Sequence, residues 1–223
     1  MCFSAEASFA ASAGLGVVGV LGLARGPSPA ARPLAFLPLL FSAQQFAEGL
    51  VWVGVAQADA ALVSVFGHVY VFFAFFVWPI LVPLASLLVE PSPRRRRIQE
   101  WLCAAGVCAA VFISASLVRE PLRVGANAGH LTYGVRLPLQ LEALAVYFAA
   151  VSAPCFSSRF WVRAFGVALV LGLALSRAHF ADAYVSLWCF AAALASGAIW
   201  FELRAQGKAA FAAGAEPVLI PIP

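Results

Sequence analysis

Long apolar runs separated by short polar stretches make up most of the chain. A membrane-spanning helix needs about 20 mainly apolar residues, and the chain has seven stretches near that length. These predicted spans are residues 5–24, 33–55, 62–89, 98–118, 137–156, 161–177 and 180–203. The pattern therefore predicts an all-α, polytopic membrane helix bundle, most simply of seven transmembrane helices. It forms one domain over residues 1–208, followed by a Pro-rich tail over residues 209–223.

Two of the predicted spans are irregular. The span 62–89 would measure about 42 Å as a continuous helix with a rise of 1.5 Å per residue. It contains Pro79 and Pro83, so we expect it to kink or tilt near them. The span 161–177 is the shortest and is the weakest prediction of the set.

Composition supports a membrane protein and excludes several other classes. Hydrophobic residues make up 63% of the chain and charged residues 11%, about half of the roughly 25% typical of soluble domains. The basic residues lie in the connections between apolar runs, so no basic face for nucleic acid is formed. Four of the five cysteines lie inside apolar runs, which argues against a secreted disulfide framework. The expected surroundings are a lipid bilayer and, in some hypotheses below, partner subunits.

The distribution of basic residues predicts the orientation. Ten of the fourteen lysines and arginines fall on one side of the predicted spans. Because cytoplasmic loops carry the excess of lysine and arginine, we expect the N-terminus outside and the C-terminus in the cytoplasm, in a cell inner membrane. The ten are Arg25, Arg32, Arg94, Arg95, Arg96, Arg97, Arg159, Arg163, Arg204 and Lys208.

This orientation places the unusual polar residues on one side. All three histidines and both mid-span carboxylates map to the outer half of the predicted bundle. An ionisable side chain in hydrocarbon costs at least about 2.5–3.5 kcal/mol, so it usually faces a partner or a cavity. The residues concerned are Glu48, His68, His130, Glu142 and His179, with Cys2, Glu6 and Asp182 near the same face. We therefore expect one polar site at the outer face.

Local spacing adds detail at two of these positions. Gln44 and Gln45 precede Glu48 by four and three residues, which places a polar stripe on one helix face. Ser64 precedes His68 by four residues, so its hydroxyl is in reach of the imidazole or of a bound water.

The ends of the predicted bundle offer two further candidates. His179 and Asp182 are three residues apart, and a carboxylate that orients a histidine is the usual outer partner of a metal ligand. Removal of Met1 would leave Cys2 with a free amine beside its thiol. That pair can chelate a metal or act as nucleophile and base.

Each candidate also has a purely structural explanation. Glu48 could bond the neighbouring glutamines between helices, and His68 could bond an adjacent helix. His130 lies in a loop, where solvation is the default. Asp182 could serve a helix N-terminus, and Cys2 could be no more than a small terminal residue.

The segments MCFSAEASF, LPLLFSAQQFAEGLVW and GHVYVFFAFFVWPILVP carry a resemblance that covers nearly the whole chain. The chain resembles a family of uncharacterised bacterial multi-pass membrane proteins that begin MCFSA. The resemblance implies an integral membrane protein and directs attention to Cys2, Glu48 and His68.

A second resemblance is to the CREST superfamily of seven-span hydrolases, which includes alkaline ceramidases and adiponectin receptors. Those proteins bind zinc through three histidines, with a serine and an aspartate nearby. Ser64 and His68 match an SxxxH element. The last helix departs from the family's HxxxH pattern, since Ala183 follows His179 where the second histidine is expected, so His130 would supply the missing ligand.

The leading hypothesis from the sequence is a metal site at the outer face. Zinc suits three imidazoles, and added carboxylates move the choice toward iron; copper is a further candidate. The ligands would be His68, His130 and His179, with Glu48 or Cys2. An enzyme built on this site would hydrolyse a lipid ester or amide, with Glu48 or Asp182 as base and Ser64 nearby.

Two other hypotheses remain open at this point. The chain could be a non-catalytic accessory subunit of a larger membrane complex, with histidines that bind haem, pigment or nothing. It could also be a transporter or sensor in which Glu48 and Glu142 are protonatable groups.

Overall fold

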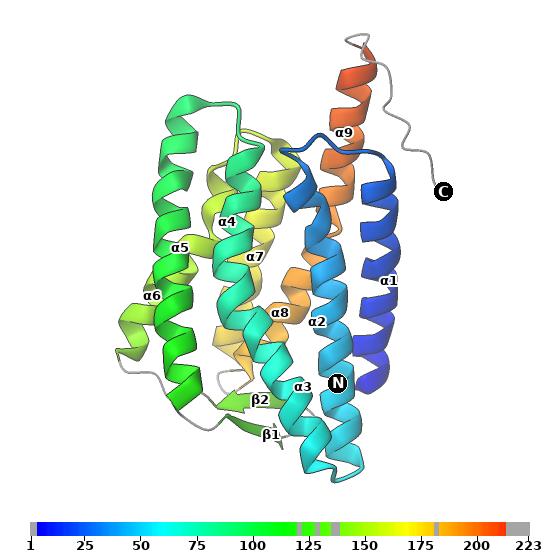
Figure 1. The fold of residues 1–223 in the computed structure, drawn as a ribbon, viewed down its shortest axis with the longest axis vertical. Helices are drawn as coiled ribbons and strands as arrows, with labels where there is room; N and C mark the ends of the chain where they lie inside the picture. Colours follow the sequence, from blue (N-terminus) through cyan, green and yellow to red (C-terminus); the bar gives the residue numbers. More distant parts are fainter. Residues whose placement is uncertain (1–3, 120–121, 128–129, 135–138, 181–182, 213–223) are drawn as a thin grey trace.

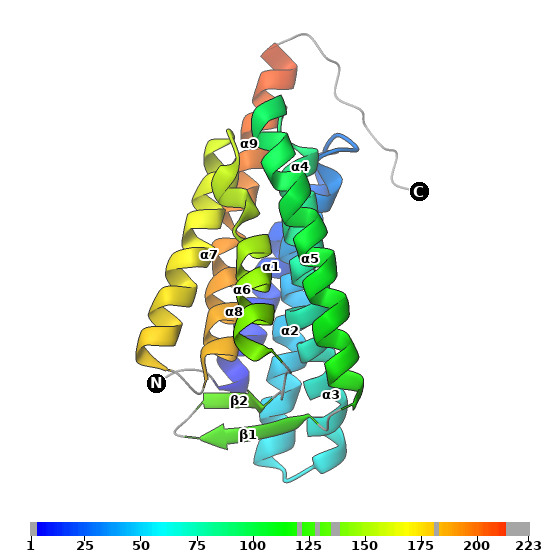
Figure 2. The same cartoon turned by 90° about the vertical axis from the view of Figure 1, so that its left-hand side faces the viewer.

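The chain folds into an elongated bundle of helices closed at one end by a small β-hairpin (Figures 1 and 2). The computed structural model describes residues 4–119, 122–127, 130–134, 139–180 and 183–212, with the backbone alone for Asn127 and residues 208–212. Within these residues, six helices are long and apolar enough to cross a membrane. The expectation of an all-α membrane bundle is confirmed at that level.

The six helices follow the predicted runs. The third and the last are each built from two helices in sequence. They are α1 (Ala5–Ala24), α2 (Arg32–Ala56), the pair α3 (Ala60–Phe72) and α4 (Trp78–Leu88), α5 (Pro93–Arg119), α7 (Phe160–His179), and the pair α8 (Tyr184–Ala195) and α9 (Ala198–Ala212). The doubtful span 161–177 is thus a regular 20-residue helix.

The predicted span 137–156 has a different form. Its helix, α6 (Gln140–Val151), has only 12 residues and is followed by the 3-10 helix η2 (Ala153–Phe156). Pro154 lies in the first turn of η2. The segment of α6 and η2 still runs along the bundle toward the start of α7 (Figure 2). Just after η2, the Ser157 carbonyl accepts a hydrogen bond of 3.1 Å from Arg95 at the start of α5.

The β-hairpin, β1 (Arg123–Asn127) with β2 (His130–Gly134), lies where the sequence predicted only an outer loop. It packs on the bundle through Leu131, which is fully buried. Gly67 of α3 lets it approach closely, since a Cβ there would lie 2.9 Å from the Val124 side chain. We call this the hairpin end.

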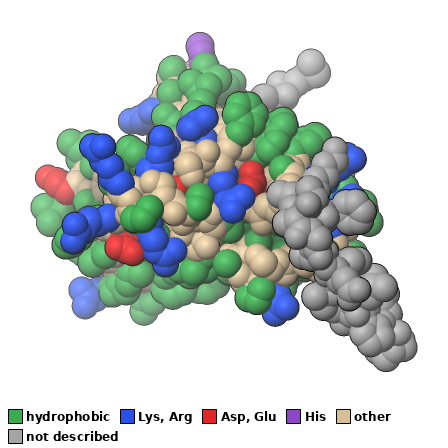
Figure 3. Space-filling model, turned by 90° about the horizontal axis from the view of Figure 1, so that it is seen from above, with side chains coloured by type: hydrophobic (Ala, Val, Ile, Leu, Met, Phe, Trp, Pro, Cys, Tyr) green, Lys and Arg blue, Asp and Glu red, His purple; other side chains and the backbone are tan. Residues whose placement is uncertain are grey.

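The opposite end, which we call the arginine end, gathers many of the basic side chains (Figure 3). Its helix termini are tied together by ionic and hydrogen-bonded contacts. Arg159, at the start of α7, donates to the Val89 carbonyl at 2.6 Å and to the Glu202 carboxylate of α9 at 3.0 Å. Arg25 lies 4.2 Å over the Trp200 ring.

Glu90 is the centre of these contacts. It is 3% exposed. Burial acts to raise the pKa of its carboxyl, but the hydrogen bonds from Ser158, Ser92 and Ser157 outweigh burial and hold the pKa below its usual value. The carboxylate accepts from the Ser92 N–H (3.0 Å), the Ser157 hydroxyl (2.9 Å), and the N–H and hydroxyl of Ser158 (2.8 and 2.6 Å).

The third span is broken in its middle, as its prolines predict, but by a π-helix. The π-helix η1 (Phe73–Val77) joins α3 to α4, and Pro79 and Pro83 follow it. Because Pro83 has no N–H, the Pro79 carbonyl lacks its usual helical partner. That carbonyl faces Gly106 of α5, where an added Cβ would lie only 1.9 Å from the oxygen.

We expect Gly106→Ala to lower the free energy of unfolding by about 1–3 kcal/mol, because α4 and α5 would have to separate. Gly14→Ala is the matched control, since nothing lies within 4 Å of a Cβ at Gly14. Thermal unfolding in detergent measures both. Equal melting temperatures for the two variants would contradict the close contact of Gly106 with Pro79.

We expect Glu90→Gln to cost about 2 kcal/mol at neutral pH, because the lost carboxylate accepts charge-assisted hydrogen bonds. The lowered pKa of Glu90 means that its stabilisation is present above the usual value of 4.5 and is lost as the pH falls through the lowered value. The difference in melting temperature between wild type and Glu90→Gln should therefore shrink below pH 4.5. Glu100→Gln, which removes an exposed ion pair with Arg96, should cost less at every pH.

Candidate functional site

The structure separates the predicted site residues. Cys2 and Asp182 lie outside the described residues. His68 is exposed on α3, and its Nδ1 donates to the Ser64 backbone carbonyl at 2.7 Å. His68 thus contacts Ser64 as the spacing suggested, but through the backbone carbonyl of Ser64 and not through its hydroxyl. The Ser64 side chain is exposed.

His130 and His179 lie beside the same aromatic ring. Both rings flank Phe180, with ring centroids 5.0 Å (His130) and 6.4 Å (His179) from the phenyl ring. Across the part of the chain that the structure describes, no three His, Cys, Asp or Glu side chains come together as a metal site. The full ligand set expected from the sequence is thus not assembled by the described residues.

Glu48 occupies a different environment from the histidines. It is 1% exposed, and its carboxyl accepts a hydrogen bond of 2.5 Å from the Ser186 hydroxyl of α8. Neither of the ion pairs found among the described residues involves it. A carboxyl group thus lies deep in the bundle with a hydroxyl partner and no cation.

The predicted polar stripe beside Glu48 is present and fully buried. Gln44 and Gln45 are both 0% exposed. The Gln44 carbonyl accepts a hydrogen bond of 2.8 Å from the Trp78 indole of α4. Trp78 in turn stacks on Phe41 of α2, with ring centroids 3.8 Å apart. The stripe therefore connects α2 to the segment just beyond the π-helix.

Two tyrosines meet on the side of Glu48 that faces the hairpin. Tyr70 of α3 is 0% exposed, and its ring stacks on Tyr133 of β2 with centroids 4.4 Å apart and an interplanar angle of 11°. Burial raises the pKa of Tyr133 well above its usual value, and the nearby Glu48 and Cys189 raise it further. The Tyr133 hydroxyl is therefore uncharged near neutral pH.

Cys189 of α8 completes this group, which we call the Glu48 cluster. Cys189 is 1% exposed and lies beside Tyr70 and Gln44. The cluster consists of Gln44, Gln45, Glu48, Tyr70, Tyr133, Ser186 and Cys189. Tyr133, Ser186 and Cys189 were not predicted, since no local spacing links a hairpin residue or α8 to α2.

The Glu48 cluster has unused hydrogen-bonding capacity. Within the described residues no partner is present for either polar atom of the Gln45 amide, for Gln44 Nε2, or for the Tyr70 and Tyr133 hydroxyls. Most buried polar groups in proteins are paired. These atoms can therefore bind water, or solvate a charge on Glu48, without breaking an existing bond.

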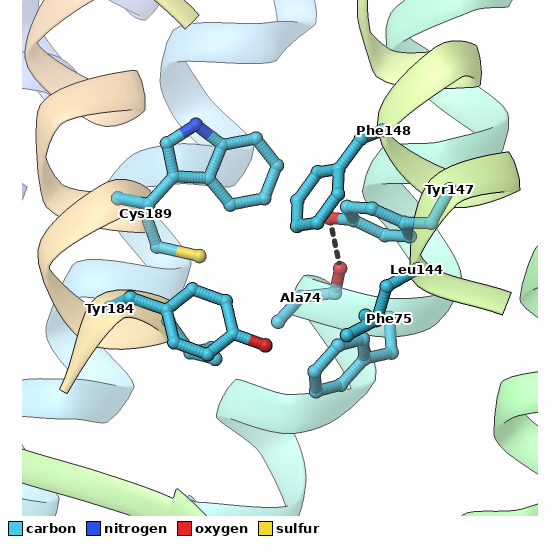
Figure 4. A pocket seen from close by; sticks show the side chains of 9 residues that line it. Ala74, Phe75, Leu144, Tyr147, Phe148, Tyr184 and Cys189 are labelled. Carbon is cyan, nitrogen blue, oxygen red and sulfur yellow. Dashed lines mark hydrogen bonds between the residues drawn. The ribbon is translucent and has the colours of Figure 1, made fainter. Parts of the chain in front are cut away.

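The walls beside the cluster are apolar. A small cavity next to Cys189 is lined by aromatic rings that include Tyr147, Phe148 and Tyr184 (Figure 4). A second cavity, on the side of Phe41 and Trp78, also touches Cys189. Each has a free volume of about 10 Å³, which is about the space that one water molecule needs. Each of these two cavities can therefore hold about one water molecule beside the cluster.

Comparison with known proteins gives a family but no activity. Neither the curated proteins nor the solved structures contain a match to this chain. The resemblance to CREST hydrolases thus gains no support. The model of a family of unknown function, DUF6629, matches residues 1–214. The chain belongs to the family of unknown function DUF6629.

Proposed function

We propose that this chain is a multi-pass membrane protein that binds and releases a proton at Glu48, as a proton-linked transporter or sensor. The observation that carries the proposal is a buried carboxyl, bonded to Ser186 and, within the described residues, without an ion-pair partner and beside polar atoms that lack partners. An unpaired charge in such an interior is costly, so loss or gain of a proton at Glu48 changes the local energy strongly.

The cluster provides partners for both forms of the carboxyl. When protonated, Glu48 keeps the hydroxyl of Ser186 and has a proton to donate to the adjacent Gln45 carbonyl. When ionised, it can accept from the Gln45 amide and from nearby tyrosine hydroxyls. Each form favours a different set of contacts between α2, α3, α8 and β2, so protonation can be coupled to a change in packing.

We also propose that the chain crosses the membrane seven times, with the hairpin end outside. The path of α6 and η2 would be the fifth crossing, shorter in helix than the others. Supporting this, Arg95, Arg159 and Arg25 all make contacts at the end opposite the hairpin, as expected for a cytoplasmic face. The C-terminal helix α9 extends on that side (Figure 1).

A metal site is the second candidate function. The observation in its favour is that His130 and His179 flank the same ring, Phe180. Cys2 and Asp182, which the sequence also suggested for a metal site, lie outside the described residues. In this version Glu48 and His68 are not ligands, and metal-assisted hydrolysis would take place near the hairpin.

We expect Glu48→Gln to abolish a proton-binding step that the wild type shows. Infrared difference spectra of protein in lipid vesicles, recorded as the pH is changed across neutrality, where exposed carboxyls stay ionised, should contain a carboxylic-acid band that titrates. The band should be absent in Glu48→Gln and present in Glu142→Gln, because Glu142 is exposed on α6. A titrating band that survives Glu48→Gln would refute the proposal.

The metal hypothesis predicts about one equivalent of zinc, iron or copper in detergent-purified protein. Plasma mass spectrometry should show that this metal is lost in His179→Ala and in His130→Ala. His68→Ala is the matched control and should keep the metal, because the His68 ring is exposed and bonded to its own helix. Metal content equal in the wild type and in both His130→Ala and His179→Ala would rule the site out.

A further inference from the structure

Glu48 lies between two stacked aromatic pairs that differ in their hydrogen-bonding groups. On the hairpin side is the pair Tyr70 and Tyr133, with centroids 4.4 Å apart. On the arginine side is the pair Phe41 and Trp78, with centroids 3.8 Å apart and an interplanar angle of 16°. Phe41 precedes Glu48 by two turns of α2, about 10 Å nearer the arginine end. We call these the hairpin-side pair and the arginine-side pair.

The two pairs differ in what lies beyond them. Beyond the arginine-side pair the core is a continuous apolar cluster, with Leu34, Leu37 and Val82 at 2% exposure or less. The hairpin-side pair instead presents two hydroxyls that have no partner among the described residues. Two hydroxyls without a described partner therefore lie on the hairpin side of Glu48, whereas the arginine-side pair presents a phenyl ring and an indole whose N–H is already bonded to Gln44.

The third span carries one ring of each pair, on opposite sides of its break. Tyr70 lies in α3 and Trp78 begins α4, and the five-residue π-helix η1 separates them. Single-turn π-helices are rare, and those that occur are often found at functional sites. Here the Ala74 carbonyl within η1 is held by the Tyr147 hydroxyl at 2.7 Å. A movement of α3 relative to α4 can thus open one pair without opening the other.

The hairpin is the element that covers the cluster on this side. It has only two strands, and a two-stranded ribbon is marginally stable by itself. Its attachment to α3 includes the contact between Val124 and Gly67. A small displacement of β2 would withdraw Tyr133 from Tyr70 and expose the cluster, while α2 and α8 stay in place.

We infer that protons and water reach Glu48 from the hairpin end, through the stacked Tyr70 and Tyr133, and that Tyr133 is the residue that closes this route. The inference rests on the proposed function, since it names the access path to the same carboxyl. Two cavities of about 10 Å³ beside Cys189 each have room for about one water molecule on this path. The arginine-side pair keeps the opposite route closed.

Cys189 is a native reporter for this path, because it lies in the cluster at 1% exposure. The background for the test replaces the other four cysteines, Cys2, Cys103, Cys108 and Cys155, by serine. The full chain is placed in sealed vesicles, and a charged, membrane-impermeant thiol reagent is added outside. Labelling of Cys189 is followed by mass spectrometry of its peptide.

Tyr133→Ala should raise the labelling rate of Cys189 at least tenfold over the background protein. Phe41→Ala, which removes a ring from the arginine-side pair, is the matched control and should leave the rate with outside reagent unchanged in hairpin-out vesicles. Orientation is measured with Ala126→Cys, exposed on β1, and Ser28→Cys, exposed between α1 and α2, each in a chain without Cys189. The labelled fraction for Tyr133→Ala should equal that for Ala126→Cys.

A second variant keeps the test informative if Tyr133→Ala folds poorly. Gly67→Cys combined with Val124→Cys places two thiols in reach of a disulfide, since a Cβ at Gly67 would lie 2.9 Å from the Val124 side chain. Oxidation should link the hairpin to α3 and lower Cys189 labelling at least fivefold, and reduction should restore it.

Labelling that follows the Ser28→Cys fraction would overturn the inference, as would a Cys189 rate unaffected by both Tyr133→Ala and the disulfide. These outcomes do not depend on whether Glu48 titrates. The infrared experiment tests the proposed function, and the Cys189 experiment tests the access path, so failure of one is distinguishable from failure of the other.

Discussion

The constraint on which this structure depends is that the bilayer interior leaves no water for unpaired polar groups. The two prolines of the third span violate that constraint, because each removes a helical N–H. The chain compensates with the π-helix η1, the bond from Tyr147 to the Ala74 carbonyl, and the close approach of Gly106 to the Pro79 carbonyl. Tyr70 and Trp78 lie on the two sides of this break.

The same constraint separates functional from structural polar groups in the core. Between α1 and α2, Ser42 donates to the Ser12 carbonyl at 2.7 Å, which satisfies it within the helix pair. At the arginine end, Glu90 accepts bonds from three serines. Glu48 differs because several polar atoms beside it, in Gln44, Gln45, Tyr70 and Tyr133, have no partner among the residues that the structure describes. A purely structural carboxyl has no need of such capacity, whereas one that alternates between charged and neutral forms does.

Sequence patterns predicted the bundle because twenty-residue apolar runs have few other folds available. They predicted the polar stripe of Gln44, Gln45 and Glu48 because helical spacing alone determines a shared face. They could not predict that the His68 side chain is exposed on α3 and does not join Glu48. The depth of a residue in the membrane says nothing about its direction around the helix. Tyr133 was missed for a related reason: its role depends on a hairpin that folds back under the bundle, and hairpin residues carry no helical periodicity.

The asymmetry of the two aromatic pairs follows from the order of the chain. α2 enters at the arginine end, so its first half meets apolar residues of α4 and α7, whereas its second half meets α3, α8 and the hairpin. Glu48 lies in this second half, where a separate element, the hairpin, closes the bundle. Water needs polar neighbours along its path as well as space. Polar neighbours lie on the hairpin side, at the Tyr70 and Tyr133 hydroxyls, whereas the cavity beside Phe41 and Trp78 is lined by apolar side chains and Cys189. In the proposed path, a proton that binds Glu48 therefore enters and leaves beneath Tyr133.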